Sequence, residues 1–159
     1  MALACRLFLY CCTVDIRNSL FLLEESVIMP SFSEASLGHL ASCDIRLHRL
    51  FERIVLTFDC TVLEGHRGKA RQQEMLRTGK SQADWPHSKH NSEPSLACDV
   101  APYPIDWNDR ERFCLFAGFV LGVASEIGIP LRWGGDWDQD WEVRDNLFDD
   151  LVHFELVED

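Results

Sequence analysis

The sequence is short of basic residues. It holds 15 lysines and arginines against 26 aspartates and glutamates, which gives a formal net charge of −11. A general nucleic-acid-binding protein needs a basic surface to neutralise phosphates, and this composition does not supply one. We therefore expect no nucleic-acid partner, and we interpret the excess acidity as a contribution to solubility.

Regular cysteine motifs are absent. The seven cysteines are irregularly spaced, and no Cys-x-x-Cys pair occurs among them. This excludes a zinc ribbon and a thioredoxin-type redox motif. Several cysteines lie among apolar residues, as Cys114 does between Phe113 and Leu115, so we expect buried, reduced thiols in a protein made in a reducing cytoplasm.

The N-terminal apolar run, residues 7–14, is too short to cross a bilayer, so we expect no stable membrane insertion. The run resembles a weak secretory segment but lacks a strongly basic stretch before it and a clear cleavage site after it. Secretion through this segment stays open. Because Met29 and Pro30 begin a stretch of different character, we predict an extension or a mis-set start over residues 1–28 and the working domain over residues 29–159.

A chain of 159 residues is long enough for one domain with its own core. Ser33 is a predicted N-cap, Asn108 with Glu111 resembles a capping box, and Gly79 and Gly128 mark helix ends. The order of helices and short strands indicates an α+β fold, with a small, mainly antiparallel sheet flanked by helices. The predicted helices span residues 34–41, 44–58, 69–78 and 109–127, and the predicted strands span residues 60–63, 96–100, 131–133 and 151–157.

The last predicted strand carries polar residues on one face. Because side chains alternate along a strand, His153 and Glu155 share one face, whereas Phe154 and Leu156 point to the core. Asp150 precedes this strand, and a bend there could bring its carboxylate to the polar face.

A second group of candidates flanks the loop that contains Pro94. His90 lies in this loop and Asp99 in or just before a strand, so both could converge with His153 on one cation. Two histidines and one aspartate supply the donor set of a catalytic zinc site with one open position, where Asp150 could act on a water molecule. In the alternative, Asp99 caps a turn and His90 is an exposed loop residue, and the spacing leaves both open.

Five short segments extend this pattern along the chain. They are Glu64-Gly65-His66-Arg67, Ser88-x-His90, Ala97-x-Asp99, Trp133-Gly134-Gly135-Asp136-Trp137 and Asp150-x-x-His153-Phe154-Glu155-Leu156. In this order they resemble the zinc peptidases of the D-Ala-D-Ala carboxypeptidase and dipeptidase family. The closer match is its bacteriophage endolysin branch, the L-alanyl-D-glutamate peptidases, and the resemblance covers residues 29–159.

The resemblance implies a zinc peptidase with its metal site on a face of the sheet. His90, Asp99 and His153 would be the ligands of Zn²⁺, Asp150 the general base, and Arg67 the residue that holds the substrate carbonyl. A fixed guanidinium stabilises the negative charge that develops on that oxygen. The alternative for Arg67 is an ordinary ion pair.

One segment departs from the family pattern, which has seven residues from histidine to aspartate and a glycine four residues before the aspartate. Here the separation between His90 and Asp99 is nine residues, and Ser95 takes the glycine position. The ligand loop is thus longer by two residues.

Neighbouring residues offer supporting roles. Glu155 could orient His153, as carboxylates beside metal ligands often do. His66 could line the cleft, whereas His87 is expected to be solvated, and Cys98 points away from the site if its segment is extended. A substrate wall and core packing are equally open for Trp133, Trp137 and Trp141.

Together these features predict a zinc-dependent endopeptidase that cleaves the L-Ala–D-Glu bond of peptidoglycan stem peptides in phage-type host lysis. A D-Ala-D-Ala carboxypeptidase or dipeptidase is the alternative within the family. A binding module with a structural zinc ion is the alternative outside it. We expect a monomer that occupies the host cytoplasm before lysis and acts on the cell wall from the periplasmic side, with wall affinity supplied by the catalytic domain itself.

Overall fold

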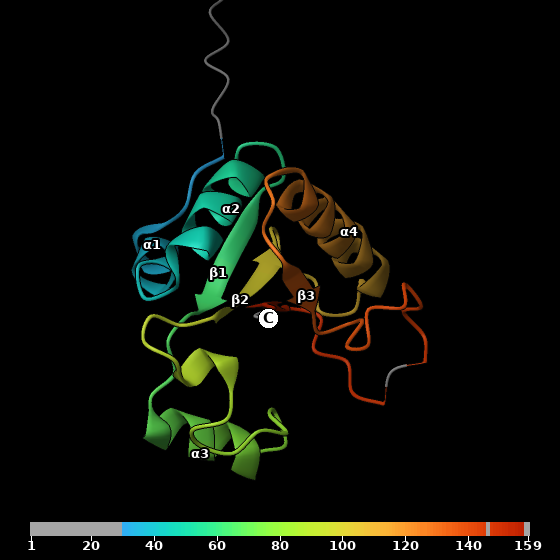
Figure 1. Ribbon diagram of the computed structural model, residues 1–159. Coiled ribbons are helices and arrows are strands. Elements are labelled where there is room, and N and C mark those ends of the chain that lie inside the picture. Colours follow the sequence, from blue (N-terminus) through green and yellow to red (C-terminus); the bar gives the residue numbers. More distant parts are fainter. Residues whose placement is uncertain (1–29, 146, 158–159) are drawn as a thin grey trace, which may run out of the picture.

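The computed structural model describes residues 30–145 and 147–157, so the predicted extension over residues 1–28 lies outside the described residues. A sheet of four strands forms its centre (Figure 1). Neighbouring strands are antiparallel, in the order β1-β2-β4-β3, and the predicted α+β class is confirmed. The strands are β1 (Cys60–Glu64), β2 (Ala97–Pro102), β3 (Leu131–Trp133) and β4 (His153–Leu156).

Two helices cover one face of the sheet. Phe154 of β4 is fully buried there, and its ring meets Phe51 of α2 at 5.6 Å and Phe116 of α4 at 6.0 Å between centroids. Figure 1 shows α2 and α4 beside each other above the strands. The opposite face of β4 is therefore left for His153 and Glu155. The helices are α1 (Glu34–Leu40), α2 (Ile45–Val55), α3 (Lys69–Arg77) and α4 (Arg110–Glu126), with a short 3₁₀ helix η2 (Lys89–Asn91).

The helix ends follow local chemistry, with two corrections to the sequence prediction. The predicted N-cap Ser33 accepts the backbone N–H of Ser36. The long helix α4, however, begins one residue later than predicted, because Asp109 rather than Asn108 is its N-cap and accepts the N–H of Arg112. Helix α2 ends at Val55 instead of residue 58. None of the described helices has the length and apolar character needed to cross a membrane.

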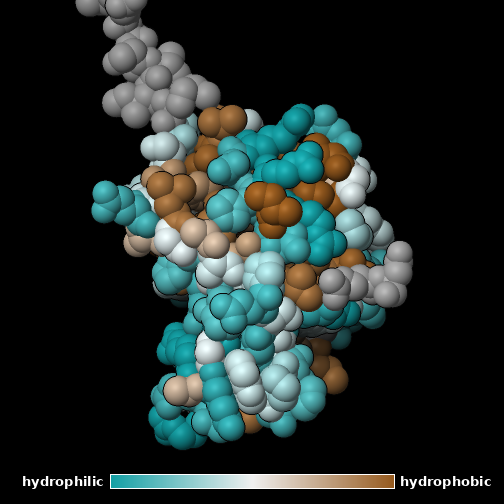
Figure 2. Space-filling view, turned by 60° about the vertical axis from the view of Figure 1, so that its left-hand side comes forward, coloured by the Kyte–Doolittle hydropathy of each residue, from teal (hydrophilic) through white to brown (hydrophobic). Residues whose placement is uncertain are grey.

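Helix α3 and the loop after it form the lower part of the molecule and lie outside the hydrophobic core. The only buried side chain of α3 is the polar Gln72. Figure 2 shows this lower part as mostly hydrophilic, whereas hydrophobic residues gather nearer the helices above. Polar contacts, rather than apolar packing, must therefore hold α3 to the rest of the domain.

The strand register sets the position of the polar face. Asp99 of β2 lies directly opposite His153 of β4 and also pairs with Glu64 of β1. One step along, Arg132 of β3 lies opposite Glu155. Because directly opposed residues lie within contact distance, the sheet itself assembles a row of charged groups.

Candidate active site

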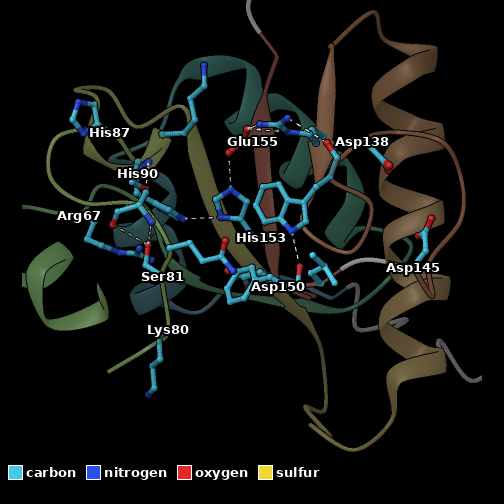
Figure 3. A pocket seen from close by; sticks show the side chains of 18 residues that line it. Arg67, Lys80, Ser81, His87, His90, Asp138, Asp145, Asp150, His153 and Glu155 are labelled. Atoms are coloured by element: carbon cyan, nitrogen blue, oxygen red, sulfur yellow. Dashed lines mark hydrogen bonds and ion pairs between the residues drawn. The ribbon is translucent and has the colours of Figure 1, made fainter. Parts of the chain in front are cut away.

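Three predicted ligands converge on the polar face of the sheet. His90 Nε2 lies 3.1 Å from Asp99 Oδ1 and 3.1 Å from His153 Nδ1, and His153 Nδ1 lies 3.2 Å from Asp99 Oδ1. All three side chains are buried, and they form a group able to hold a metal ion. The alternative of an exposed His90 and a turn-capping Asp99 is therefore wrong. Figure 3 shows His90 and His153 facing the same cavity.

The other ring nitrogen of each histidine has its own partner. His90 Nδ1 lies 2.7 Å from the carbonyl oxygen of Gly65, which requires a proton on that nitrogen. His153 Nε2 lies 2.9 Å from Glu155 Oε2. These contacts leave His90 Nε2 and His153 Nδ1 as the atoms that face one another and Asp99.

The charges of this group are strongly coupled. Burial alone would lower the pKa of His153, but its hydrogen bonds to Asp99 and Glu155 raise it to about 9. Burial alone would raise the pKa of Asp99, but the nearby charges and hydrogen bonds of His90 and His153 hold it well below its usual range. Without a metal, a proton on His153 thus compensates the buried carboxylates.

Glu155 holds His153 from behind, as the sequence suggested. Its other oxygen accepts the guanidinium of Arg132, and Arg132 also donates to the carbonyl of Trp137. Burial would raise the pKa of Glu155, but its hydrogen bond with His153 and the charges of His153 and Arg132 hold it at about 2. Glu155 is therefore a carboxylate across the neutral pH range.

Arg67 is both an ion-pair partner and a residue of the cavity. Its Nε and NH2 groups donate to Glu64 Oε2 at 3.0 and 2.6 Å, and NH2 also donates to Asp99 Oδ2 at 3.2 Å. Its NH1 group donates to Gln72 at 3.3 Å. Because these partners use four of its five N–H groups, one NH1 hydrogen is left for another acceptor.

Gln72 is a site residue that the sequence interpretation missed. It is fully buried, and its Oε1 accepts from Arg67 NH1 and from Asn91 Nδ2. Its Nε2 donates to Ser81 Oγ at 3.0 Å and to the carbonyl of Ala83 at 2.6 Å. Gln72 therefore joins Arg67 to the loop that follows α3. No pattern in the sequence marked Gln72, because it lies in a polar helix with no apolar stripe.

A two-residue turn separates Asp150 from β4, which begins at His153 rather than at residue 151 as predicted. Asp150 lines the cavity with Arg67 and His153 (Figure 3). Its backbone N–H donates to the carbonyl of Gly134 at 2.7 Å, and its own carbonyl accepts the N–H of His153 at 3.1 Å. Burial raises the pKa of Asp150, and the negative charge of Asp99 acts in the same direction. The predicted base thus lies beside the histidine with its proton affinity increased.

The cavity at this site measures about 610 Å³. The loop after α3 lines one wall with Lys80 and His87, and the segment after β3 lines the other with Trp137 and Asp145. A second cavity of about 470 Å³ is lined by Asp99 and Trp107. The two cavities share Lys80, Phe148 and Asp150, so they adjoin at the candidate base. The space beside Asp150 therefore extends beyond the main cavity.

The other residues considered in the sequence differ in whether they line the cavity. Trp133 is buried in the core, whereas Trp137 lines the cavity and Trp141 is exposed beside a different hollow. His66 does not line the main cavity, and His87 is exposed but lies at its edge, where its Nδ1 contacts Asp84. Cys43, Cys60 and Cys98 are buried in the core, as expected, whereas Cys114 is only partly buried.

A second acidic group lies in the turn after β3. Carboxylate oxygens of Asp136, Asp138 and Asp140 lie within 4.8 Å of one another. Asp136 is buried, and its carboxylate accepts the backbone N–H groups of Asp140 and Trp141. These bonds explain its burial as part of the turn.

The comparisons with known proteins agree with this geometry. The model of the phage L-alanyl-D-glutamate peptidase family matches residues 29–157. The chain belongs to this family. Among its relatives, the L-alanyl-D-glutamate peptidase of Escherichia phage T5 is 31% identical over 134 residues, which cover 79% of this chain and 97% of the phage protein.

A solved structure of a related enzyme has the same fold. The crystal structure of the Serratia marcescens L-Ala D-Glu endopeptidase ChiX matches with a TM-score of 0.61 and 28% sequence identity. The match covers 80% of this chain and 91% of the Serratia protein. As a member of the phage L-alanyl-D-glutamate peptidase family, the chain is a peptidase, and the resemblance found in the sequence is confirmed.

Proposed function

We propose that this chain is a zinc-dependent endopeptidase that hydrolyses the L-alanyl–D-glutamate bond of peptidoglycan stem peptides. The observation that carries the proposal is the convergence of His90, Asp99 and His153 beside Asp150 and Arg67 at one cavity. The relatives from phage T5 and Serratia are named for this bond, which supports the choice of substrate.

The donor set fits zinc in number, kind and spacing. Three ligands of a tetrahedral zinc ion, each about 2.0–2.1 Å from the metal, lie about 3.3 Å from one another. The three facing atoms of His90, Asp99 and His153 lie 3.1–3.2 Å apart. Two imidazoles and one carboxylate also leave a fourth position open, as in catalytic zinc sites. We therefore assign these three residues as the zinc ligands.

A bound zinc ion would polarise the scissile carbonyl and make a water molecule more acidic. Asp150 is placed to accept the proton of the attacking water and to deliver it to the amine that leaves. Its raised pKa favours both transfers, since a very weakly basic carboxylate would accept a proton poorly. The remaining NH1 hydrogen of Arg67 would donate to the carbonyl oxygen as negative charge develops on it.

The two cavities favour an endopeptidase over a D-Ala-D-Ala carboxypeptidase or dipeptidase. An endopeptidase must accommodate chain on both sides of the bond that it cuts, whereas a carboxypeptidase needs to enclose only a short C-terminal product. Here cavities of about 610 and 470 Å³ meet at Asp150 and Lys80. Two adjoining cavities at the base give an extended stem peptide more space than a short C-terminal product needs.

The same geometry disfavours a purely structural metal. Structural zinc sites are closed by four protein ligands, but this group has three and opens to the cavity beside Asp150. The peptidoglycan partner and action at the cell wall follow from the proposed reaction. A monomeric state and a cytoplasmic location before lysis remain predictions.

Digestion of purified peptidoglycan tests the proposal. The wild-type chain should release fragments with new N-terminal D-glutamate, detected by mass analysis after end-labelling. A chelator should stop the release and added zinc should restore it. Release of free D-alanine instead would favour the carboxypeptidase, and undiminished cleavage in chelator would contradict a metal-dependent reaction.

A variant of the base separates catalysis from metal binding. Asp150→Ala should bind zinc with the affinity of the wild type and release no fragments. Full activity in Asp150→Ala would exclude the role assigned to this carboxylate.

A further inference from the structure

We propose that Trp133 and Trp137 act as a clamp that positions the candidate base Asp150 through their indole N–H groups. This inference rests on the proposed role of Asp150. It assigns a function to the Trp133-Gly134-Gly135-Asp136-Trp137 segment, whose residues supply none of the metal ligands.

The two indoles hold the chain on either side of Asp150. Trp137 Nε1 donates to the carbonyl of Phe148 at 2.8 Å, and Trp133 Nε1 donates to the carbonyl of Leu151 at 2.9 Å. These acceptors lie two residues before Asp150 and one residue after it. Between them, the Asp150 N–H itself donates to the carbonyl of Gly134. Five consecutive residues thus supply three hydrogen bonds to the four-residue stretch that carries the base.

Gly134 allows the two segments to approach this closely. A Cβ atom at this position would lie 2.5 Å from the carbonyl oxygen of Asp150 and 3.0 Å from the Asp150 Cβ. Because such contacts are far shorter than van der Waals distances, any larger residue would push the base away. The N–H of Gly134 also donates to the carbonyl of His153 at 2.9 Å, so the same glycine contacts a metal ligand.

Trp137 also touches the metal-ligand group. Its ring centroid lies 5.4 Å from that of His153, with the planes inclined by 35°. The guanidinium of Arg132 lies 5.4 Å from the same indole. Trp137 therefore contacts the ring of one ligand while its N–H fixes the backbone beside the base. Through these contacts the clamp sets the position of Asp150 relative to the ring of His153.

Substitution of tryptophan by phenylalanine tests this role, because it keeps an aromatic ring and removes the N–H. For Trp137→Phe we expect kcat to fall about tenfold, the loss expected for one hydrogen bond, with KM and zinc affinity within twofold of the wild type. The matched control is Trp141→Phe, which changes an exposed tryptophan of the same loop and should leave all three quantities unchanged.

A double-substitution experiment shows whether Trp137 acts through Asp150. Added to Asp150→Asn, the Trp137→Phe change should reduce the remaining single-turnover rate by less than twofold, because the base it positions is gone. A full tenfold loss in that background would show an independent action and overturn the proposal. A rise in KM with unchanged kcat would show a substrate wall instead, and would overturn it equally.

Amide hydrogen exchange gives a readout that does not depend on activity. In the zinc-loaded protein, peptides covering residues 148–151 should exchange faster in Trp137→Phe than in Trp141→Phe or the wild type. Equal exchange in all three would overturn the clamp. If the wild type fails to cleave peptidoglycan, the proposed function fails, whereas exchange still tests the clamp by itself. Trp133→Phe is the second variant. If this protein folds despite the substitution in its core, we expect the same peptides to exchange faster than in the wild type.

Discussion

The two halves of the site are built in different ways. The strand half, Asp150 with His153 and Glu155, lies within six residues and is positioned by strand pairing and by the chain after β3. The loop half, His90 and Asp99 with the segment between them, spans ten residues and is fixed mainly at its ends. Gly65 holds the ring of His90, and the sheet holds Asp99.

This difference explains how the loop half can be longer than the family pattern. The extra residues lie between two fixed ends, where the chain bonds to itself and to the segment before α2. Ser88 caps η2, the N–H of Leu96 donates to the carbonyl of Lys89, and the backbone of Ser95 bonds to Ser42 and Asp44. Ser95, at the usual glycine position, is buried, and its hydroxyl donates to the carbonyl of Ala97. The ligand atoms therefore meet despite the insertion.

The largest effect is expected when the candidate general base of the strand half, Asp150, is replaced. Asp150→Asn should lower kcat by a factor of about 10²–10⁴, the range for loss of a general acid–base group, with zinc still bound. The control is Glu74→Gln, which removes only an exposed ion pair with Arg77 and should stay near wild-type activity. Single-turnover rates with metal analysis decide between them. Equal activity of the two variants would contradict the assignment.

The next largest effect is expected when Gln72, which supports the loop half, is replaced. Gln72→Leu leaves buried N–H groups of Arg67 and Asn91 without their acceptor, at a cost of about 1–3 kcal/mol for each group. We expect the free energy of unfolding to fall by about 2–4 kcal/mol. Chemical denaturation measures this loss, and Gln73→Leu, on the exposed side of the same helix, is the control. A stable Gln72→Leu protein would show that the loop half does not depend on this contact.

A smaller effect is expected when the contact behind His153 is weakened. Glu155→Gln removes the charge that orients this ring and should lower zinc affinity by about 10–100-fold. Competition with a fluorescent chelator measures the change. Glu126→Gln removes a similar but exposed pair with Arg53 and should leave zinc affinity unchanged. Unaltered affinity in both would mean that Glu155 does not orient the ligand.

The smallest effect concerns protons in the metal-free protein. The pKa of His153 is raised to about 9, above the 6.5 of a free histidine, so its protonated form stabilises the fold. This contribution is complete below pH 6.5 and is lost as the pH rises through about 9. Denaturation in chelator should show stability falling over this interval, and zinc binding at pH 7 should release about one proton. A flat stability profile would contradict the protonated state.

The sequence alone predicted the strand half well, because strand alternation and short spacing determine it. His153 and Glu155 share a face, and Asp150 precedes them, as expected. The loop half required the fold, since periodicity carries no information about where the loop after His90 returns to the sheet. Residue types suggested His90 and Asp99 as candidate ligands but left the alternative open, and the family resemblance favoured them.

The polar network around Gln72 could not be predicted in the same way. A glutamine at the start of a polar helix has the sequence appearance of a solvated residue, and only the position of α3 against the loop makes it buried. The sequence also left the roles of the tryptophans open. In the structure, Trp133 and Trp137 differ in exposure yet make the same kind of hydrogen bond. Hydrogen bonds between distant segments depend on tertiary packing.

The central claim is that the two halves meet at one zinc ion, and anomalous X-ray diffraction from crystals of the zinc-loaded chain tests it most directly. Data collected on both sides of the zinc absorption edge should show one strong peak bonded to His90 Nε2, Asp99 Oδ1 and His153 Nδ1. A zinc-saturated crystal with no peak there, or with its only peak at the acidic turn of Asp136–Asp140, would contradict the account.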